Sequence, residues 1–225
     1  YCAGKPIGEY DDKIPTDLTA EEILIRSGNI GSVRIGQKVG IEQLKLFLKN
    51  IGVLNKIEFD IEEVGKPHSL KWGKCKLATA SYGHGITTTP IQLARAYAIL
   101  GNGGYKIKPS IIKRKIASQE SKKQIISKKT SETINLMLRK VVSLDEGTAN
   151  FADIEGYDVG GKTGTSLKYN SSAKLNTFVS VFPTSKPKYV LLVMLDEPKP
   201  APNFLYEFPP SEKFPNGYKH KGETR

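Results

Sequence analysis

Two short runs of β-branched and aromatic residues, 177–182 and 189–195, lie only six residues apart near the carboxyl end of the chain. Parallel strands need a crossover of about a dozen or more residues, so this spacing favours an antiparallel hairpin. The patterns before residue 145 are helical instead. Helices first and antiparallel strands afterwards predict an α+β fold, with a helical subdomain and an antiparallel sheet, rather than a doubly wound fold.

Four segments carry helix signals. A capping box at Thr19–Glu22 predicts a short helix that ends at about Arg26. Apolar residues at helical spacing predict a second helix over 41–51, which Gly52 ends. Thr89 followed by proline predicts a third helix, which stops at the glycine-rich stretch 101–104. A fourth is expected over 131–142.

The composition divides the chain into three parts. Residues 1–157 are expected to be mainly helical, and residues 158–198 to form the strands of the sheet. Six of the thirteen prolines fall between Pro198 and Pro215. We therefore expect 1–198 to be one partial domain and 199–225 to be a proline-rich loop or tail.

The charge and the cysteines exclude several classes of function. The chain has 34 basic and 23 acidic residues, for a net charge of +11. Its basic clusters lack interleaved aromatic residues and a recognition helix, so we expect no nucleic-acid partner. Cys2 and Cys75 form no CxxC motif, and we expect neither a metal site nor a cofactor. The longest apolar run, 190–195, is far shorter than the roughly 20 residues that span a membrane.

The glycine-rich segment 156–166 matches two unrelated motifs. Residues 156–163 fit the phosphate-binding pattern GxxxxGKT, and the run 189–197 resembles an apolar strand that ends in an acid. A phosphate-binding loop requires a preceding strand and a helix that begins at its lysine and threonine. Neither signal is present, so a P-loop ATPase remains only a remote alternative.

The second match is Lys-Thr-Gly at 162–164, which pairs with Ser-Gly-Asn at 27–29. Either triplet alone is weak evidence, but their order and surroundings are specific. From residue 1 to 198 the chain resembles a class B penicillin-binding protein of the division-specific D,D-transpeptidase type. The segments that carry this resemblance are 23–31, 81–86, 89–94, 159–165 and 192–198.

The resemblance implies a catalytic serine in an SxxK motif that precedes SxN in the chain. Three serines downstream of Ser27 match SxxK by pattern, at Ser110, Ser171 and Ser185, but their sequence contexts do not fit the required helix. No serine precedes Ser27. We therefore expect the nucleophile and its lysine base to lie upstream of Tyr1, and this chain alone to be inactive.

The resemblance also implies roles for the residues that are present. The Ser27 hydroxyl would relay a proton towards the leaving amine, and the Asn29 amide would bind a substrate peptide bond. Lys162 would lower the pKa of Ser27 and attract the terminal carboxylate of the substrate. The expected catalytic residues are Ser27, Asn29 and Lys162, and the expected substrate-binding residues are Thr163, Gly164 and Thr165, the last also through its oxyanion-hole N–H.

In this interpretation the substrate is a peptidoglycan stem peptide that ends in D-Ala-D-Ala, and β-lactams are inhibitors. The implied partners are membrane proteins of the divisome, including a glycosyltransferase. The implied location is the periplasmic face of the inner membrane, with an N-terminal anchor helix outside this chain. Two alternatives remain open: a D,D-carboxypeptidase or serine β-lactamase, and a non-catalytic penicillin-binding sensor or scaffold domain.

Three structural predictions follow from this interpretation. Ser27 and Lys162 should approach within hydrogen-bond reach, and 159–166 should form a strand beside 177–182. In the family two further strands and two terminal helices complete the sheet, and none of them is readable here. We therefore expect an exposed apolar patch and an unpaired edge on the sheet.

Overall fold

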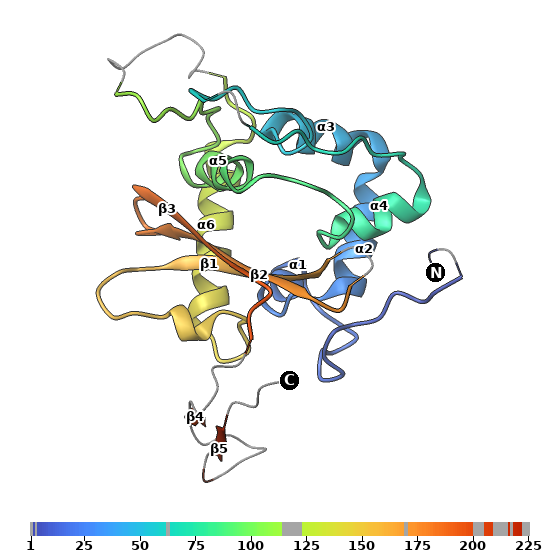
Figure 1. Cartoon of the computed structure of the whole chain (residues 1–225), viewed down its shortest axis with the longest axis vertical. Coiled ribbons are helices and arrows are strands. Elements are labelled where there is room, and N and C mark those ends of the chain that lie inside the picture. Colours follow the sequence, from blue (N-terminus) through green and yellow to red (C-terminus); the bar gives the residue numbers. More distant parts are fainter. Residues whose placement is uncertain are drawn as a thin grey trace. The chain divides into compact units, whose positions relative to one another are not determined.

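The computed structural model (Figure 1) describes residues 2, 4–61, 64–113, 123–168, 171–199, 205–208, 216 and 218–221. The chain divides into two compact units. The larger unit consists of Tyr1–Gly164 and Phe178–Val193, and the smaller one of Thr165–Thr177 and Met194–Arg225. Helices precede an antiparallel three-stranded sheet, so the predicted α+β class is confirmed. None of the described helices is both long and apolar enough to cross a bilayer.

Six α-helices are present in the described residues, and four of them were predicted from the sequence. The predicted capping box forms at the start of α1, where Thr19 bonds with Glu22. The predicted start of α5 at Thr89 and Pro90 is also present, and there Thr89 forms a second capping box with Gln92. The helices are α1 (Ala20–Ile25), α2 (Asn29–Val39), α3 (Ile41–Ile51), α4 (Lys74–Ser81), α5 (Pro90–Gly101) and α6 (Lys128–Ser143), and a short 3-10 helix, η2 (Asn150–Ala152), follows.

Helices α2 and α4 were not predicted from the sequence, because the residue before each helix is a glycine without a capping side chain. The residue before α2, Gly28, has no side chain that could cap the helix. The cap comes instead from Glu9, whose carboxylate accepts hydrogen bonds from the backbone N–H groups of Asn29 (2.6 Å) and Ile30 (2.9 Å). Helix α4 spans only eight residues and also begins at a glycine, Gly73, without a side-chain cap. A cap supplied from a distant segment leaves no local sequence signal.

The sheet contains β1 (Gly160–Leu167), β2 (Lys174–Phe182) and β3 (Tyr189–Asp196), in the order β1-β2-β3. The predicted hairpin therefore forms, and the predicted strand around Lys162 lies beside β2. A phosphate-binding loop would need a helix that starts at Lys162, where the structure has a strand. The P-loop alternative is therefore wrong.

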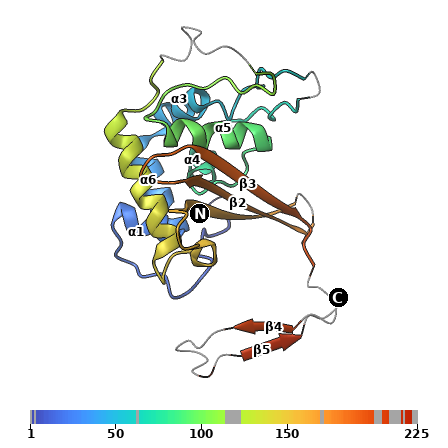
Figure 2. The same ribbon diagram turned by 90° about the vertical axis from the view of Figure 1, so that its left-hand side faces the viewer.

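Helix α6 packs directly against the backbone of β1, which explains a glycine at the start of the strand. A Cβ atom at Gly160 would lie 2.4 Å from Thr184 and 2.9 Å from the backbone nitrogen of Arg139 in α6. The Arg139 guanidinium donates to the carbonyl of Val159 (3.0 Å), the residue before β1. These contacts fix the first residue of β1 against α6, the long helix that lies beside the sheet in Figure 2.

The core beneath β1 and β2 joins α1 to α6. Ile25 of α1 packs with Val141 and Val142 of α6, and Phe178 of β2 lies against this cluster. Val141 and Val142 are fully buried. Because Ile25 ends α1, this packing fixes the position of the turn that follows the helix.

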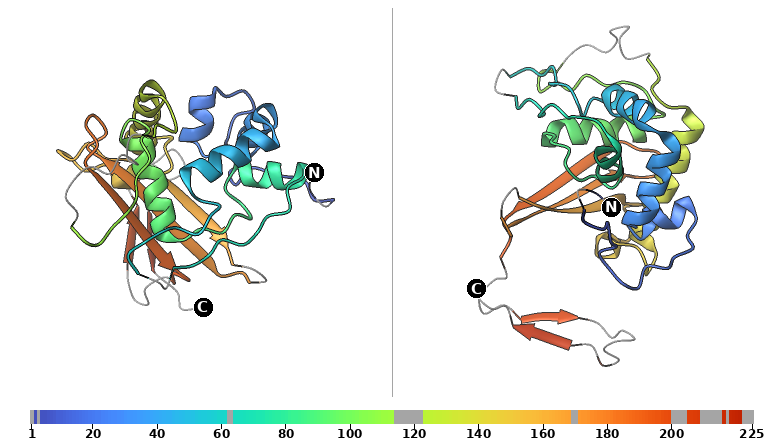
Figure 3. Two further views of the ribbon diagram at one scale, coloured as in Figure 1. Left: turned by 90° about the horizontal axis from the view of Figure 1, so that it is seen from above. Right: turned by 90° about the vertical axis from the view of Figure 1, so that its right-hand side faces the viewer.

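The remaining helices pack around α5 and α2. Asn135 of α6 donates to the carbonyl of Gly101 at the end of α5 (3.3 Å). Helix α2 lies beside α4, as Figure 3 shows, and Gly36 of α2 faces Ser81 of α4 so closely that a Cβ would clash with the serine hydroxyl. This close approach holds α4 against the helix that begins at Asn29.

Strand β3 leaves an apolar row exposed at one edge of the sheet. Tyr189, Leu191 and Val193 are 60%, 50% and 44% exposed, and β3 pairs with β2 on one side only among the described strands. The predicted exposed patch and unpaired edge are thus present in the described residues. The near-continuous apolar runs of both hairpin strands predict burial on both faces. This holds in β2, where Val179, Ser180 and Val181 are buried, but it is wrong for β3.

The expected loop at 199–225 contains secondary structure. β4 (Leu205–Phe208) and β5 (Tyr218–Lys221) pair antiparallel, with Leu205 opposite Lys221 and Phe208 opposite Tyr218. The expected proline-rich loop or tail therefore contains two short paired strands, which the composition did not predict because proline-rich sequence marks connections and not the strands that flank them. Most of the other residues of this segment lie outside the described part of the chain, and the predicted boundary at residue 198 stays a prediction.

Candidate active site

Ser27 occupies a strained backbone position at the end of α1. Its amide donates to the carbonyl of Leu24 (3.3 Å), and the amide of Gly28 donates to that of Ile23 (2.9 Å). This pair of bonds is a Schellman motif, in which the residue at the Ser27 position is left-handed and is usually glycine. Ser27 has φ = 58°. A serine with its Cβ in this conformation costs about 1–2 kcal/mol, and such strain is typical of functional sites.

Lys162 of β1 reaches Ser27 across 135 residues of sequence. Its Nζ donates to the Ser27 Oγ at 2.8 Å, to the Thr148 Oγ1 at 3.3 Å and to the carbonyl of Thr163 at 3.2 Å. The predicted contact between Ser27 and Lys162 is therefore present. Together the bonds leave the ammonium group with three oxygen acceptors and no carboxylate among them.

Burial without a counter-ion changes the titration of this lysine. Removal from water lowers the pKa of Lys162 from 10.5 to about 8. The side chain is therefore mostly charged at neutral pH but is poised to lose a proton slightly above it. A lysine in this state can stabilise a developing negative charge and can also exchange a proton with the Ser27 hydroxyl.

Thr148 belongs to the site, although it is not among the predicted catalytic and substrate-binding residues. It lies in the loop after α6, and its hydroxyl also accepts a hydrogen bond from the Thr163 hydroxyl (3.0 Å). Thr148 therefore connects Lys162 and Thr163 in one hydrogen-bonded cluster with Ser27. The signal that could have found it is Gly-Thr-Ala at 147–149, which resembles a family loop near the cleft but is explained equally well as a helix stop.

Asn29 lies close in sequence to Ser27, but its amide has another partner. The Nδ2 group donates to the carbonyl of Gly8 at 3.0 Å. This bond orients the side chain towards the N-terminal segment that also supplies Glu9. The substrate-binding role of Asn29 stays a prediction.

Gly164 and Thr165 follow the cluster along β1, and both are exposed. A Cβ at Gly164 would meet nothing within 4 Å, so the space over this part of the strand is open. An extended peptide can pair with such an exposed strand through backbone hydrogen bonds. The predicted substrate-binding roles of Thr163, Gly164 and Thr165 fit this arrangement and stay predictions.

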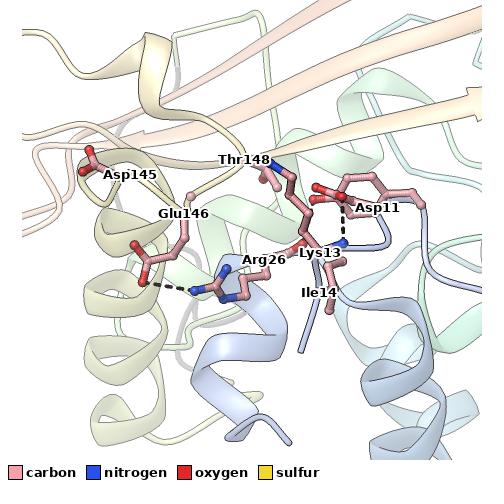
Figure 4. Close-up of a pocket in the computed structure, with 9 residues that line it drawn as sticks. Asp11, Lys13, Ile14, Arg26, Asp145, Glu146 and Thr148 are labelled. Atoms are coloured by element: carbon pink, nitrogen blue, oxygen red, sulfur yellow. Dashed lines mark hydrogen bonds and ion pairs between the residues drawn. The ribbon is translucent and has the colours of Figure 1, made fainter. Parts of the chain in front are cut away.

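A pocket of about 270 Å³ lies beside the cluster, with Thr148 as one of its walls (Figure 4). Its other walls carry charges of both signs. Arg26, adjacent to Ser27, forms an ion pair with Glu146 at 3.8 Å, and Lys13 and Asp145 also line the pocket. The pocket thus offers charged side chains of both signs beside the Ser27 turn.

The three serines that match SxxK by pattern have contacts away from the Lys162 cluster. The Ser110 hydroxyl donates to Asp60, the Ser171 hydroxyl accepts from the backbone N–H of Ala173, and the backbone N–H of Ser185 donates to Asp158. None of the hydrogen bonds of Lys162 involves these serines. In the residues that the structure describes, no group of three or more His, Cys, Asp and Glu side chains could hold a metal ion.

The sequence profile described as "Penicillin binding protein transpeptidase domain" matches residues 2–207. The chain therefore belongs to the penicillin-binding protein transpeptidase family, and the class B resemblance found in the sequence is confirmed. Among relatives, it is 34% identical over 199 residues to the peptidoglycan D,D-transpeptidase FtsI of Buchnera aphidicola subsp. Baizongia pistaciae, covering 81% of this chain and 34% of that protein. It is also 34% identical over 196 residues to stage V sporulation protein D of Bacillus subtilis, covering 79% and 30%.

Solved structures agree with this membership. The transpeptidase domain of penicillin-binding protein 3 from Burkholderia pseudomallei superimposes with a TM-score of 0.75 at 30% identity, covering 80% of this chain and 57% of that one. A peptidoglycan glycosyltransferase from Burkholderia ambifaria gives a TM-score of 0.79 at 28% identity, covering 87% and 61%. The chain spans about a third of the length of the curated relatives.

Proposed function

We propose that this chain is the SxN and KTG part of a peptidoglycan D,D-transpeptidase that cross-links stem peptides during septal cell-wall synthesis. The single observation that carries the proposal is the 2.8 Å hydrogen bond between Lys162 Nζ and Ser27 Oγ. It joins the two family motifs in one cluster, with a strained serine on one side and a lysine of lowered pKa on the other.

The chemistry of this cluster suits acyl transfer. In the first step the attacking serine gives its proton to a base, its Oγ forms a bond with the carbonyl carbon of the penultimate D-Ala, and the bond from that carbon to the nitrogen of the terminal D-Ala breaks. Ser27 delivers a proton to this leaving nitrogen and regains the proton that the attacking serine gave up, and the charge of Lys162 favours the ionised state that Ser27 passes through. In the second step an amine of another stem peptide attacks the acyl carbon, the bond from that carbon to the serine Oγ breaks, and the proton that the amine loses returns to this Oγ.

We propose that the attacking serine comes from residues outside 1–225. The described candidates Ser110, Ser171 and Ser185 have other contacts, and the curated relatives extend well beyond the region that they share with this chain. Binding of β-lactams, a periplasmic location with a membrane anchor, and divisome partners that include a glycosyltransferase belong to the same proposal. The description of the matched family supports the binding of β-lactams. The location and the partners rest on the family resemblance.

The proposal is tested with the full-length protein, a synthetic stem pentapeptide that ends in D-Ala-D-Ala, and an amine acceptor. We expect release of D-alanine together with a cross-linked product, detected by mass spectrometry. D-alanine release with only hydrolysed donor would instead favour the carboxypeptidase or β-lactamase alternative. A stable penicillin adduct without turnover of the peptide would favour a sensor or scaffold domain.

A second experiment addresses the source of the nucleophile. The 225-residue chain alone should form no covalent adduct with a labelled penicillin, whereas the full-length protein should form one. An adduct on the 225-residue chain, mapped by peptide mass spectrometry, would place the nucleophile within these residues and would contradict this part of the proposal.

A further inference from the structure

The two cysteines of the chain, which are 73 residues apart in sequence, lie against each other in the structure. The Cys2 Sγ donates a hydrogen bond to the backbone carbonyl of Cys75 at 3.6 Å. The side chains also interact: a side-chain hydrogen bond with Cys75, with burial acting in the same direction, raises the pKa of the Cys2 thiol. Within residues 1–225 these are the only two cysteines, so a disulfide within this part of the protein has one possible pairing.

Each cysteine is positioned by the backbone around it. Cys2 exchanges two backbone hydrogen bonds with Lys5, at 2.8 and 3.0 Å, which fold the start of the chain into a tight bridge. Cys75 lies in the first turn of α4, where its side chain is exposed, whereas Cys2 is half-buried. An oxidant in solution therefore reaches Cys75 first, and the Cys2 sulfur lies close enough to complete the exchange.

We propose that Cys2 and Cys75 form a reversible disulfide that fastens the N-terminal segment to α4. The oxidant is a disulfide in solution, such as oxidised glutathione or the disulfide of a thiol oxidoreductase. The Cys75 thiolate attacks one sulfur of that disulfide, and a first thiol leaves. The Cys2 thiolate then attacks the Cys75 sulfur, and the second thiol leaves, so the protein loses two electrons and two protons and the oxidant gains them.

The fastened segment holds the turn that carries Ser27. It contains Glu9, which caps the start of α2, and Tyr10, whose hydroxyl donates to the carbonyl of Arg26 at 2.9 Å. Helix α4 in turn packs closely on α2. The disulfide would thus link the two segments that contact α2, the one with Glu9 and the one that forms α4. Oxidation should therefore slow the local unfolding of the first turn of α2.

The test begins with the full-length protein in its folded state, treated with oxidised glutathione after full reduction. We expect a species that has lost the mass of two hydrogen atoms, and peptide mapping without reductant should find Cys2 linked to Cys75. Hydrogen exchange should show slower exchange of the Asn29 and Ile30 amides in the oxidised protein than in the reduced one. A Cys75→Ser variant should show no difference between the two treatments.

A matched control moves the thiol by one position. The double variant Cys75→Ser, Lys74→Cys keeps two cysteines, but the second cysteine projects from a different side of α4. Because disulfide geometry is specific, the rate at which its internal disulfide forms should be lower by about tenfold or more. Equal rates in the control and the wild type, or dimers linked through Cys75 in place of the internal bond, would overturn the proposal. So would an oxidised protein in which exchange at the start of α2 is unchanged.

Discussion

Replacing Lys162 with methionine should remove a pH dependence from the stability of the fold. The pKa of Lys162 is about 8 in the folded protein, because of burial, and 10.5 in the unfolded chain. Between these two values the unfolded state binds more protons than the folded state, so a rise in pH stabilises the fold. Below pH 8 the folded protein must keep a buried charge, and methionine fills a similar volume without that charge.

The size of the effect follows from the two pKa values. Their difference corresponds to about 3 kcal/mol of unfavourable free energy for the charged side chain at neutral pH. Integration of the linkage relation from pH 7 to pH 9.5 gives about 2 kcal/mol of that amount. The wild type should therefore gain about 2 kcal/mol of stability relative to Lys162→Met over this range. Groups other than Lys162 titrate in both proteins and cancel in the comparison.

The measurement is the free energy of unfolding in urea for both proteins at half-unit steps from pH 7 to pH 9.5. Lys162→Met also loses the hydrogen bonds of the ammonium group, which changes the free energy of unfolding by the same amount at every pH. The test is therefore how the difference in unfolding free energy between the two proteins changes with pH, and not its value at one pH. A difference that stays constant across the range would show that Lys162 is not buried in its charged form, and would refute the reasoning.

Three further predictions concern the elements that position the site, each checked by urea unfolding. Ser27→Gly should be more stable than Ser27→Ala by about 1 kcal/mol, because both lose the hydroxyl and only glycine relieves the positive φ; equal stability would contradict the strain. Gly160→Ala should destabilise the fold by about 1–3 kcal/mol, since its Cβ would meet the backbone of α6. Thr89→Ala should cost about 1 kcal/mol through loss of the α5 cap, and a wild-type value would argue against the capping box.

Local signals in the sequence were sufficient for several elements. The capping box at Thr19 and the proline after Thr89 marked the starts of α1 and α5 because the groups that satisfy these helix ends lie within the same four residues. The six-residue connection before Tyr189 determined the antiparallel hairpin. The contact between Ser27 and Lys162 could not be predicted from such local signals, because no pattern within either triplet relates the two segments. It was predicted from the family resemblance.

Other features depend on contacts between distant segments, which a single sequence does not record. Helix α2 is capped by Glu9, which lies 20 residues before Asn29, and no residue next to the helix indicates where the helix begins. Thr148 belongs to the site because it forms hydrogen bonds with Lys162 and Thr163 of β1, whereas the residues around it in the sequence are typical of a helix end. The strand β3 has the composition of a strand buried on both faces, and its exposure depends on which elements cover it rather than on its residues.

The most direct test of the central claim is the rate at which the full-length protein is acylated by a labelled penicillin. We compare the wild type with Ser27→Ala, Lys162→Ala and the double variant, and use Lys128→Ala as a matched control because that side chain is 77% exposed on α6. Each single change at the site should slow acylation by about 10²-fold or more, and the double variant should be no slower than the slower single variant, because the two residues act as one unit. Acylation of Lys162→Ala at the rate of Lys128→Ala would contradict the account.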